Sequence, residues 1–152
     1  MNDDRTRPGG EGPWRKVPAG DPALLRFPPA VQEFLTQVGL PDSPQLGLRF
    51  DLSFEPVDGL WKVGSDATGA LCLDANGALW CMHADGTRFI NSTPHLFFMC
   101  RLAYRNRELS EARSEAEVQQ ADDALAAHIA RVDPPAMAAD AWWPRLLEGS
   151  QE

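Results

Sequence analysis

The stretch from Leu60 to Arg105 most constrains the fold, because it changes from strand-like to helix-like periodicity with almost no connecting chain. Short apolar segments at 60–63, 70–73 and 87–90 are separated by Gly, Asn and Asp, residues that favour tight turns. Residues 90–94 (Ile-Asn-Ser-Thr-Pro) then lead directly into apolar residues at helical spacing. Strands joined by tight turns and followed at once by a helix predict an α+β fold, with a mixed or antiparallel sheet of about five or six strands flanked by helices.

Asn76-Gly77 lies between the segment 70–73 and a following strand that carries Leu79, Trp80 and Met82, and it is a strong hairpin signal, since both residues accept the positive φ of a type I′ turn. A loop of two residues and a loop of four residues place the same side chains of the two strands on a common face of the sheet. Either loop length predicts that one face of the hairpin turns toward the core. The side chains on that face would be Leu71, Leu73, Trp80 and Met82.

The three cysteines, Cys72, Cys81 and Cys100, all lie in apolar segments. With the two-residue loop Cys72 would face Cys81 at a distance that permits a cross-strand disulfide. The alternative is that both are reduced thiols that fill the core, and the odd number of cysteines favours this interpretation. We therefore predict reduced, buried thiols.

Two segments before residue 60 also have regular periodicity. Residues 31–38 place apolar side chains at helical spacing and are followed by Gly39, which predicts a short amphipathic helix that ends there. Residues 46–54 alternate apolar and polar side chains, as a half-buried strand does. The apolar, even-numbered positions of this strand are predicted to face the core.

After the strands, a helix is predicted to begin at Pro94, whose missing N–H costs nothing there, with Ser92 or Thr93 as its cap. Its apolar stripe would consist of Leu96, Met99, Cys100 and Ala103, broadened by Phe97, Leu102 and Tyr104. A second helix, rich in Ala and acidic residues, is predicted over 110–132. Its inward residues would be Ala121, Leu125, Ile129 and Val132, and a final packing element would come from Trp142, Trp143, Leu146 and Leu147.

Residues 1–22 contain three interruptions rich in Gly and Pro and almost no apolar periodicity. Burial there cannot offset the entropy lost on ordering, so we predict a disordered tail followed by a single domain over 23–152. Trp14 is the exception, because it could dock on the domain. The alternative, which is commoner for an isolated aromatic residue in such a segment, is a loosely ordered side chain.

The formal charge of −8 is concentrated in the last third of the chain. Residues 108–152 hold ten acids and three bases (−7), whereas residues 1–107 hold twelve acids and eleven bases (−1). Such a field repels nucleic acid and anionic membranes and attracts cationic partners. We find neither an apolar run of the roughly 18 residues that a membrane span needs nor the apolar segment of a signal peptide. The pattern predicts a cytoplasmic protein that binds neither nucleic acid nor membrane directly.

No residues with recognisable catalytic spacing compete with a binding function. The histidines His83, His95 and His128 form no recognisable pattern with a nucleophile. Ser92 precedes a helix, but capping explains it, because its neighbours lack the glycines of a nucleophile elbow. We therefore predict that the protein is not an enzyme and that it has no cofactor.

A zinc site formed by Cys72, Cys81 and His83 is the alternative to two buried thiols and an imidazole at the sheet edge. Cys81 and His83 have the same parity along one strand and can therefore share a face. The spacing Cys-x8-Cys-x-His, however, is not a standard zinc pattern. We predict no metal site on this basis.

Five short motifs follow one another along the chain, and their order carries more information than any one of them alone. They are Phe34-Leu35-x-x-Val38-Gly39-Leu40-Pro41, Val63-Gly64-Ser65, Leu71-Cys72-Leu73-Asp74, Asn76-Gly77-x-Leu79-Trp80 and Phe89-Ile90-Asn91-Ser92-x-x-x-Leu96-Phe97. This order resembles the SUKH superfamily, and most closely the fourth SUKH subfamily of immunity proteins. The resemblance covers roughly Pro28 to Leu147, and the entry to the second helix is its most specific match. Thr93-Pro94-His95 departs from the small or acidic stretch that is usual in the family.

The resemblance implies an α+β domain and a role in immunity. Members of the superfamily bind and neutralise secreted polymorphic toxins, including nucleases and nucleic-acid deaminases, in the producing cell. A cognate protein toxin is then the expected partner, with a monomer as the favoured state. SUKH domains also occur in regulatory and scaffold proteins, so a partner other than a toxin is the alternative. The resemblance further implies that Gly39, Gly64, Asn91 and Ser92 form the fold rather than contact a partner.

The predicted acidic helix is the candidate surface for that partner. Carboxylates on one face can imitate a phosphate backbone and speed the encounter with a cationic toxin. The alternative is a merely solvated helix face, which is the usual meaning of such a run of acids. The candidate partner-binding residues are Glu115, Glu117, Asp122 and Asp123.

Overall fold

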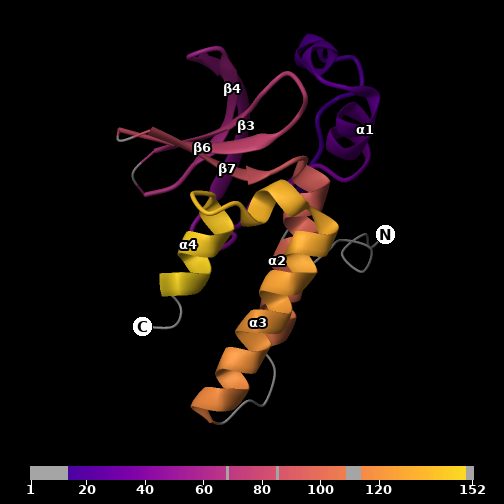
Figure 1. Ribbon diagram of the computed structural model, residues 1–152. Helices are drawn as coiled ribbons and strands as arrows, with labels where there is room; N and C mark the ends of the chain where they lie inside the picture. The colour runs from indigo at the N-terminus through magenta and orange to yellow at the C-terminus, as the bar shows by residue number, and fades with distance from the viewer. Residues whose placement is uncertain (1–13, 68, 85, 109–113, 150–152) are drawn as a thin grey trace.

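The computed structural model describes residues 14–67, 69–84, 86–108 and 114–149 and shows one five-stranded antiparallel sheet (Figure 1). Its strands follow the chain order: β3 (Arg49–Val57), β4 (Leu60–Ser65), β5 (Ala70–Leu73), β6 (Leu79–His83) and β7 (Gly86–Asn91). A second, two-stranded sheet pairs β1 (Trp14–Arg15) with β2 (Leu40–Pro41). The helices are α1 (Pro29–Gln37), α2 (Pro94–Glu108), α3 (Glu115–Val132) and α4 (Trp142–Gly149), with 3-10 turns η2 (Pro22–Arg26) and η3 (Pro134–Met137). The predicted α+β class is confirmed.

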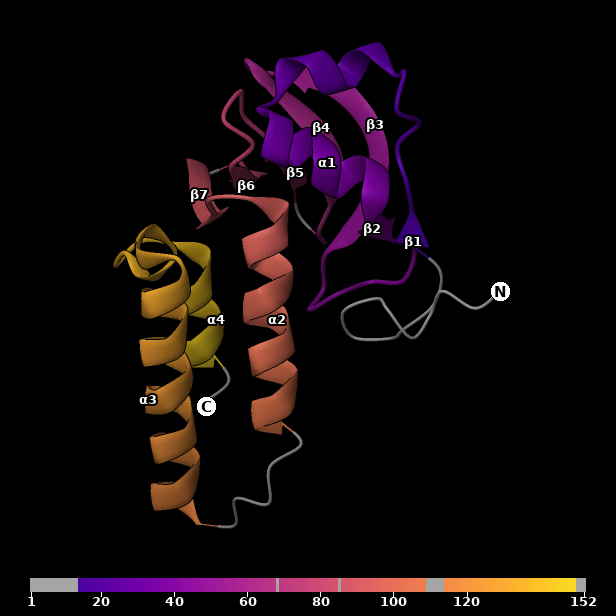
Figure 2. The same ribbon diagram turned by 90° about the vertical axis from the view of Figure 1, so that its right-hand side faces the viewer.

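The helices fall into two groups around the sheet. Figure 2 shows α1 in front of β3, β4 and β5, while α2 leaves the end of β7 and runs away from the sheet beside α3 and α4. A single cluster of buried apolar side chains extends from the strands through α1 and α2 to Trp143 of α4. The sheet and the helices are therefore held by one continuous core.

The β5–β6 hairpin has the opposite parity to the one predicted. Leu73 pairs with Leu79, so the loop contains the five residues 74–78, and an odd loop inverts the faces of the second strand. Trp80 and Met82 are only half-buried and lie on the face opposite the core. The core face of the hairpin consists of Leu71, Leu73, Leu79 and Cys81.

The same register decides the question of the cysteines. Cys72 pairs with Trp80, and Cys81 pairs with Leu71, so the approach of Cys72 to Cys81 that a two-residue loop would allow does not occur. The two side chains lie on opposite faces of the sheet, which rules out a disulfide between them. Both are buried free thiols, as is Cys100. This agrees with the favoured interpretation of the sequence.

The alternation predicted for residues 46–54 holds for burial but not for the backbone. Leu48, Phe50 and Phe54 are buried, and Leu52 is half-buried. The strand β3 is displaced to 49–57, and its pairing with β4 shifts register after Phe50. Positive φ angles at Leu52 and Phe54 accompany this bulge, which bends the strand.

The helices predicted at 31–38 and 110–132 are confirmed, with shifted ends. The α1 helix buries Val31, Phe34 and Leu35. The α3 helix begins at Glu115, after a capping box in which the side chains of Ser114 and Glu117 each accept the other's backbone N–H at 3.1 Å. Residues 110–113 of the predicted helix lie outside the described residues.

The α2 helix turns only part of the predicted stripe inward. Its cap is Thr93, whose Oγ1 accepts the Leu96 N–H at 3.1 Å. Met99 and Leu102 are 42% and 38% exposed. The prediction is right for Cys100 and for Phe97 and Tyr104, and wrong for Met99 and Leu102. Nearly every residue of this helix up to Tyr104 could face a core, and the large aromatic side chains bury the most area. The buried set is Phe97, Phe98, Cys100, Arg101 and Tyr104.

Residues 14–22, which the sequence assigns to a disordered tail over 1–22, include side chains that pack on the domain. Trp14 is buried with its ring centroid 4.8 Å from that of Phe98, and Val17 donates its N–H to the Leu35 carbonyl oxygen at 2.9 Å. Docking of Trp14, the rarer alternative, is therefore what occurs, because burial of a large indole offsets the ordering of a few residues. Residues 1–13 of the predicted tail lie outside the described residues.

Two glycines allow backbones to approach closely in this fold. Gly39 has a φ of +86°, and a Cβ there would collide with the Arg15 carbonyl oxygen of β1. A Cβ on Gly64 would collide with the Arg49 carbonyl oxygen of β3. Both glycines thus serve the fold, as the family resemblance implies.

Candidate functional site

Asn91 and Ser92 belong to a buried hydrogen-bond network at the junction of β7 and α2. The Asp133 carboxylate accepts three hydrogen bonds, from Asn91 Nδ2 at 2.9 Å, Ser92 Oγ at 2.6 Å and the Ser92 backbone N at 2.7 Å. Trp143 Nε1 donates to Asn91 Oδ1 at 2.9 Å. The network joins the sheet to η3 and α4. Asn91 and Ser92 are therefore structural, and Ser92 is held by Asp133 while Thr93 provides the cap.

The four candidate acids of α3 differ in their exposure to solvent. Glu115 and Asp123 are exposed, and Glu117 is exposed while its carboxylate completes the capping box. Asp122 is only 3% exposed. It is buried together with Leu125 and Ile129, so of the four candidate acids it presents the least surface to a partner.

Helix geometry also prevents these acids from forming one contact face. Successive residues of an α-helix are rotated by about 100°, so Glu115 and Asp122, seven residues apart, lie within about 20° of each other. Glu117 is rotated by about 160° from Glu115, and Asp123 by about 100° from Asp122. The exposed acids thus produce a field around the first turns of α3 rather than a single patch.

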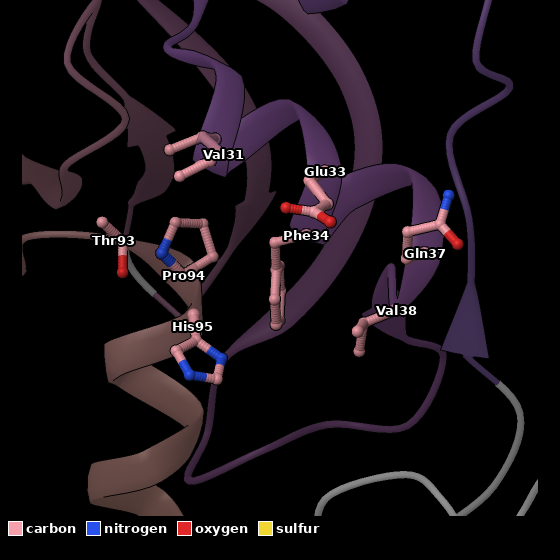
Figure 3. Close-up of a pocket in the computed structure, with 9 residues that line it drawn as sticks. Val31, Glu33, Phe34, Gln37, Val38, Thr93, Pro94 and His95 are labelled. Atoms are coloured by element: carbon pink, nitrogen blue, oxygen red, sulfur yellow. The ribbon is translucent and has the colours of Figure 1, made fainter.

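A groove of about 400 Å³ lies between α1 and the start of α2 (Figure 3). Phe34 lies along it, with its ring edge-on to His95 at 5.5 Å between centroids. Glu33, Gln37 and His95 are exposed along its border. An apolar depression with a polar rim can accept an apolar side chain of a partner.

A second, more open groove of about 350 Å³ lies between α2 and α3. Its lining includes the exposed apolar side chains of Met99 and Leu102 together with His128. Glu117 lies on the same side of α3 as His128, because eleven residues correspond to about three turns. Glu117 is nevertheless about 16 Å from His128 along the helix axis, so the groove itself offers accessible apolar surface and the acids lie beyond it, at the start of α3.

A third cluster gathers Asp66, Cys81 and His83 at one end of the sheet. Asp66 Oδ2 lies 2.8 Å from His83 Nε2 and 3.2 Å from Cys81 Sγ, and Sγ lies 3.1 Å from Nε2. Burial, followed by the hydrogen bond to Asp66, raises the pKa of Cys81 to about 12. The thiol is protonated at neutral pH and is a poor nucleophile.

The residue that joins Cys81 and His83 is Asp66, in place of Cys72, which the sequence suggested. Cys72 lies on the other face of the sheet, and the third residue is Asp66, from the turn between β4 and β5. No standard spacing connects Asp66 with a cysteine fifteen residues later. The two-residue interval between Cys81 and His83 was the one usable signal.

A family model described as SUKH-4 immunity protein matches residues 9–149. No curated protein and no solved structure matches the chain. None of the helices in the described part of the chain combines the length and apolar character that a membrane span requires.

Proposed function

This chain belongs to the SUKH-4 immunity protein family, and from that premise we propose that it binds and neutralises a cognate bacterial toxin in the cytoplasm of the cell that makes the toxin. The observation that carries the proposal is the family match, which extends over nearly the whole chain. Toxin immunity is the general function of this family. In this proposal the protein acts by occupying the toxin rather than by a catalytic step of its own.

We further propose that the toxin acts on nucleic acid, as a nuclease or a deaminase. Enzymes of that kind bind a polyanion and therefore need a cationic substrate cleft. The last third of this chain carries a charge of −7, which complements such a cleft. The same charge disfavours direct binding of the immunity protein to nucleic acid.

Charge complementarity favours the α2–α3 side of the molecule as the docking surface. Met99 and Leu102 supply accessible apolar atoms there, and the exposed acids Glu115 and Asp123 belong to the adjoining helix α3. The α1–α2 groove is larger, but Glu33 is the one acid in its lining. We therefore place the apolar anchors on α2 and the steering charges on the first turns of α3.

Co-expression with the toxin-like open reading frames beside its gene tests the function. Survival of the host together with co-purification of a stable complex is the expected result. Rescue that requires no complex would contradict the binding mechanism. Failure of every neighbouring reading frame to be neutralised would favour the regulatory or scaffold alternative.

Reversing two exposed acids of α3 is expected to slow association with the toxin. Glu115→Lys combined with Asp123→Lys changes the formal charge from −8 to −4 and leaves the capping box intact. Loss of steering should lower the association rate constant roughly tenfold at low salt and flatten its salt dependence, with little change in dissociation. Stopped-flow or surface-based kinetics over a salt series would measure both rates.

A charge-matched control separates a local field from net charge. Glu55→Lys with Glu148→Lys makes the same change in formal charge at exposed positions outside α3. This control is expected to alter the association rate much less. Equal slowing by the two pairs would assign the effect to net charge, and unchanged rates in the α3 pair would refute steering by this helix.

A further inference from the structure

Three different metal-ligating atoms converge where the β4–β5 turn meets the end of β6. Asp66 Oδ2, Cys81 Sγ and His83 Nε2 are separated by 2.8 to 3.2 Å in every pairing. From this geometry we propose that Asp66, Cys81 and His83 bind a zinc ion. The proposal goes beyond toxin binding and does not depend on it.

Two hydrogen bonds account for only two of the three short contacts in this triangle of atoms. The carboxylate oxygen can accept one proton from the His83 N–H and one from the Cys81 S–H. The sulfur and the nitrogen, 3.1 Å apart, then face each other with no proton left between them. If the thiol donates to Nε2 instead, the nitrogen and the carboxylate oxygen face each other as two acceptors. A divalent cation would release the thiol proton, leave the imidazole with its proton on Nδ1, and bind all three atoms at once.

The surrounding chain holds the three groups toward a common point. The Gly69 N–H donates to Asp66 Oδ1 at 2.7 Å, which leaves Oδ2 directed at Cys81 and His83. Cys81 and His83 are two residues apart on β6 and share one side of the strand. A Cβ on Gly69 would collide with the Met82 carbonyl oxygen and with the His83 ring, so this glycine allows both the backbone of β6 and the imidazole to approach. Such supporting contacts are typical of metal ligands.

The distances and chemistry suit zinc with a small adjustment. Zinc binds Cys, His and Asp at about 2.0–2.3 Å, so tetrahedral ligand atoms lie about 3.3–3.6 Å apart. Each pair must therefore separate by a few tenths of an ångström. Asp66 and His83 can supply this movement, because their side chains are 16% and 22% exposed and lie at a turn and a strand end. Three protein ligands leave the fourth position for solvent.

Titration of the metal-free full chain with Zn²⁺ and Co²⁺ tests the site. We expect one equivalent of zinc per chain by elemental analysis, and a thiolate-to-cobalt charge-transfer band with Co²⁺. Cys81→Ser, Asp66→Asn and His83→Gln should each weaken zinc binding by more than about tenfold, and Cys81→Ser should abolish the charge-transfer band. Added zinc should also raise the melting temperature of the unmodified chain, and this increase should be lost in the three variants.

Two thiol controls test whether zinc binding is specific to Cys81. Cys72→Ser and Cys100→Ser remove the other buried thiols and are expected to leave the zinc stoichiometry and the cobalt band unchanged. Should Cys81→Ser fold poorly, Asp66→Asn and His83→Gln alter partly exposed side chains and retain the buried thiol. Absence of saturable binding, or equal zinc uptake by the unmodified chain and all three ligand variants, would overturn the site.

Discussion

Replacing Asp133 with alanine is expected to lower the free energy of unfolding by about 3–5 kcal/mol, because one buried donor and two partly buried donors then lose their acceptor. Those donors are Asn91 Nδ2, Ser92 Oγ and the Ser92 backbone N–H. Each unsatisfied buried group costs about 1–3 kcal/mol, and water entering the vacated space recovers part of that loss. Urea unfolding followed by tryptophan fluorescence and by circular dichroism would measure the change.

Matched variants show whether the loss comes from the network. Asp123→Ala removes an exposed acid of α3 and is expected to change stability by less than about 0.5 kcal/mol. Trp143→Phe removes the N–H that Asn91 accepts, so its effect should not add to that of Asp133→Ala. A loss below about 1 kcal/mol for Asp133→Ala, or strict additivity of the two substitutions, would show that the four residues do not act as one unit.

This network gives a physical reason for the motif at the entry to α2. Local sequence indicates a strand end, a helix cap and a proline at the first helical turn, and these predictions hold. The roles of Asn91 and Ser92 depend on Asp133, which lies more than forty residues later, and on Trp143 beyond it. No periodicity links residues so far apart, so sequence reasoning identified two members of the network and missed the other two.

The hairpin error has a similarly specific cause. The dipeptide Asn76-Gly77 indicates a turn but does not determine the loop length. In the structure the Asp74 carboxylate accepts the N–H groups of Asn76 and Ala78, and the indole N–H of Trp80. These contacts stabilise a five-residue loop and invert the parity of β6. Strand positions were thus predictable from local patterns, whereas the face of each strand depended on a side chain.

Some residues of the acidic helix and of the Asp66, Cys81 and His83 cluster could be predicted from the sequence, and others could not. Charge counting located the acidic third of the chain, and helical geometry alone places Glu115 and Asp122 on one side of α3. The burial of Asp122 required knowledge of where α2 packs. Cys81 and His83 share a strand and were paired correctly, but Asp66 joins them through the pairing of β5 with β6. Contacts that arise only from tertiary packing therefore could not be predicted from local sequence patterns.

The boundary of the domain is where the structure changes the sequence prediction most, and Trp14 provides the test. Trp14→Ala is expected to lower the free energy of unfolding by about 3–5 kcal/mol, the usual loss for a buried aromatic residue. Leu25→Ala, at a side chain that is 81% exposed, is the matched control and should leave stability nearly unchanged. Both variants would be measured by thermal and urea unfolding of the full chain.

A second substitution at Trp14 tests whether a smaller aromatic ring can replace the indole. The indole N–H is buried and has no hydrogen-bond partner among the described residues. Phenylalanine would keep a ring against Phe98 and remove that N–H, so Trp14→Phe should retain most of the stability that Trp14→Ala loses. Equal losses in the two variants would indicate that the site needs the full volume of the indole and that a smaller aromatic ring cannot replace it. A loss near zero for Trp14→Ala would instead return this segment to the disordered tail that composition predicts, because a docked indole is the feature that makes its ordering favourable.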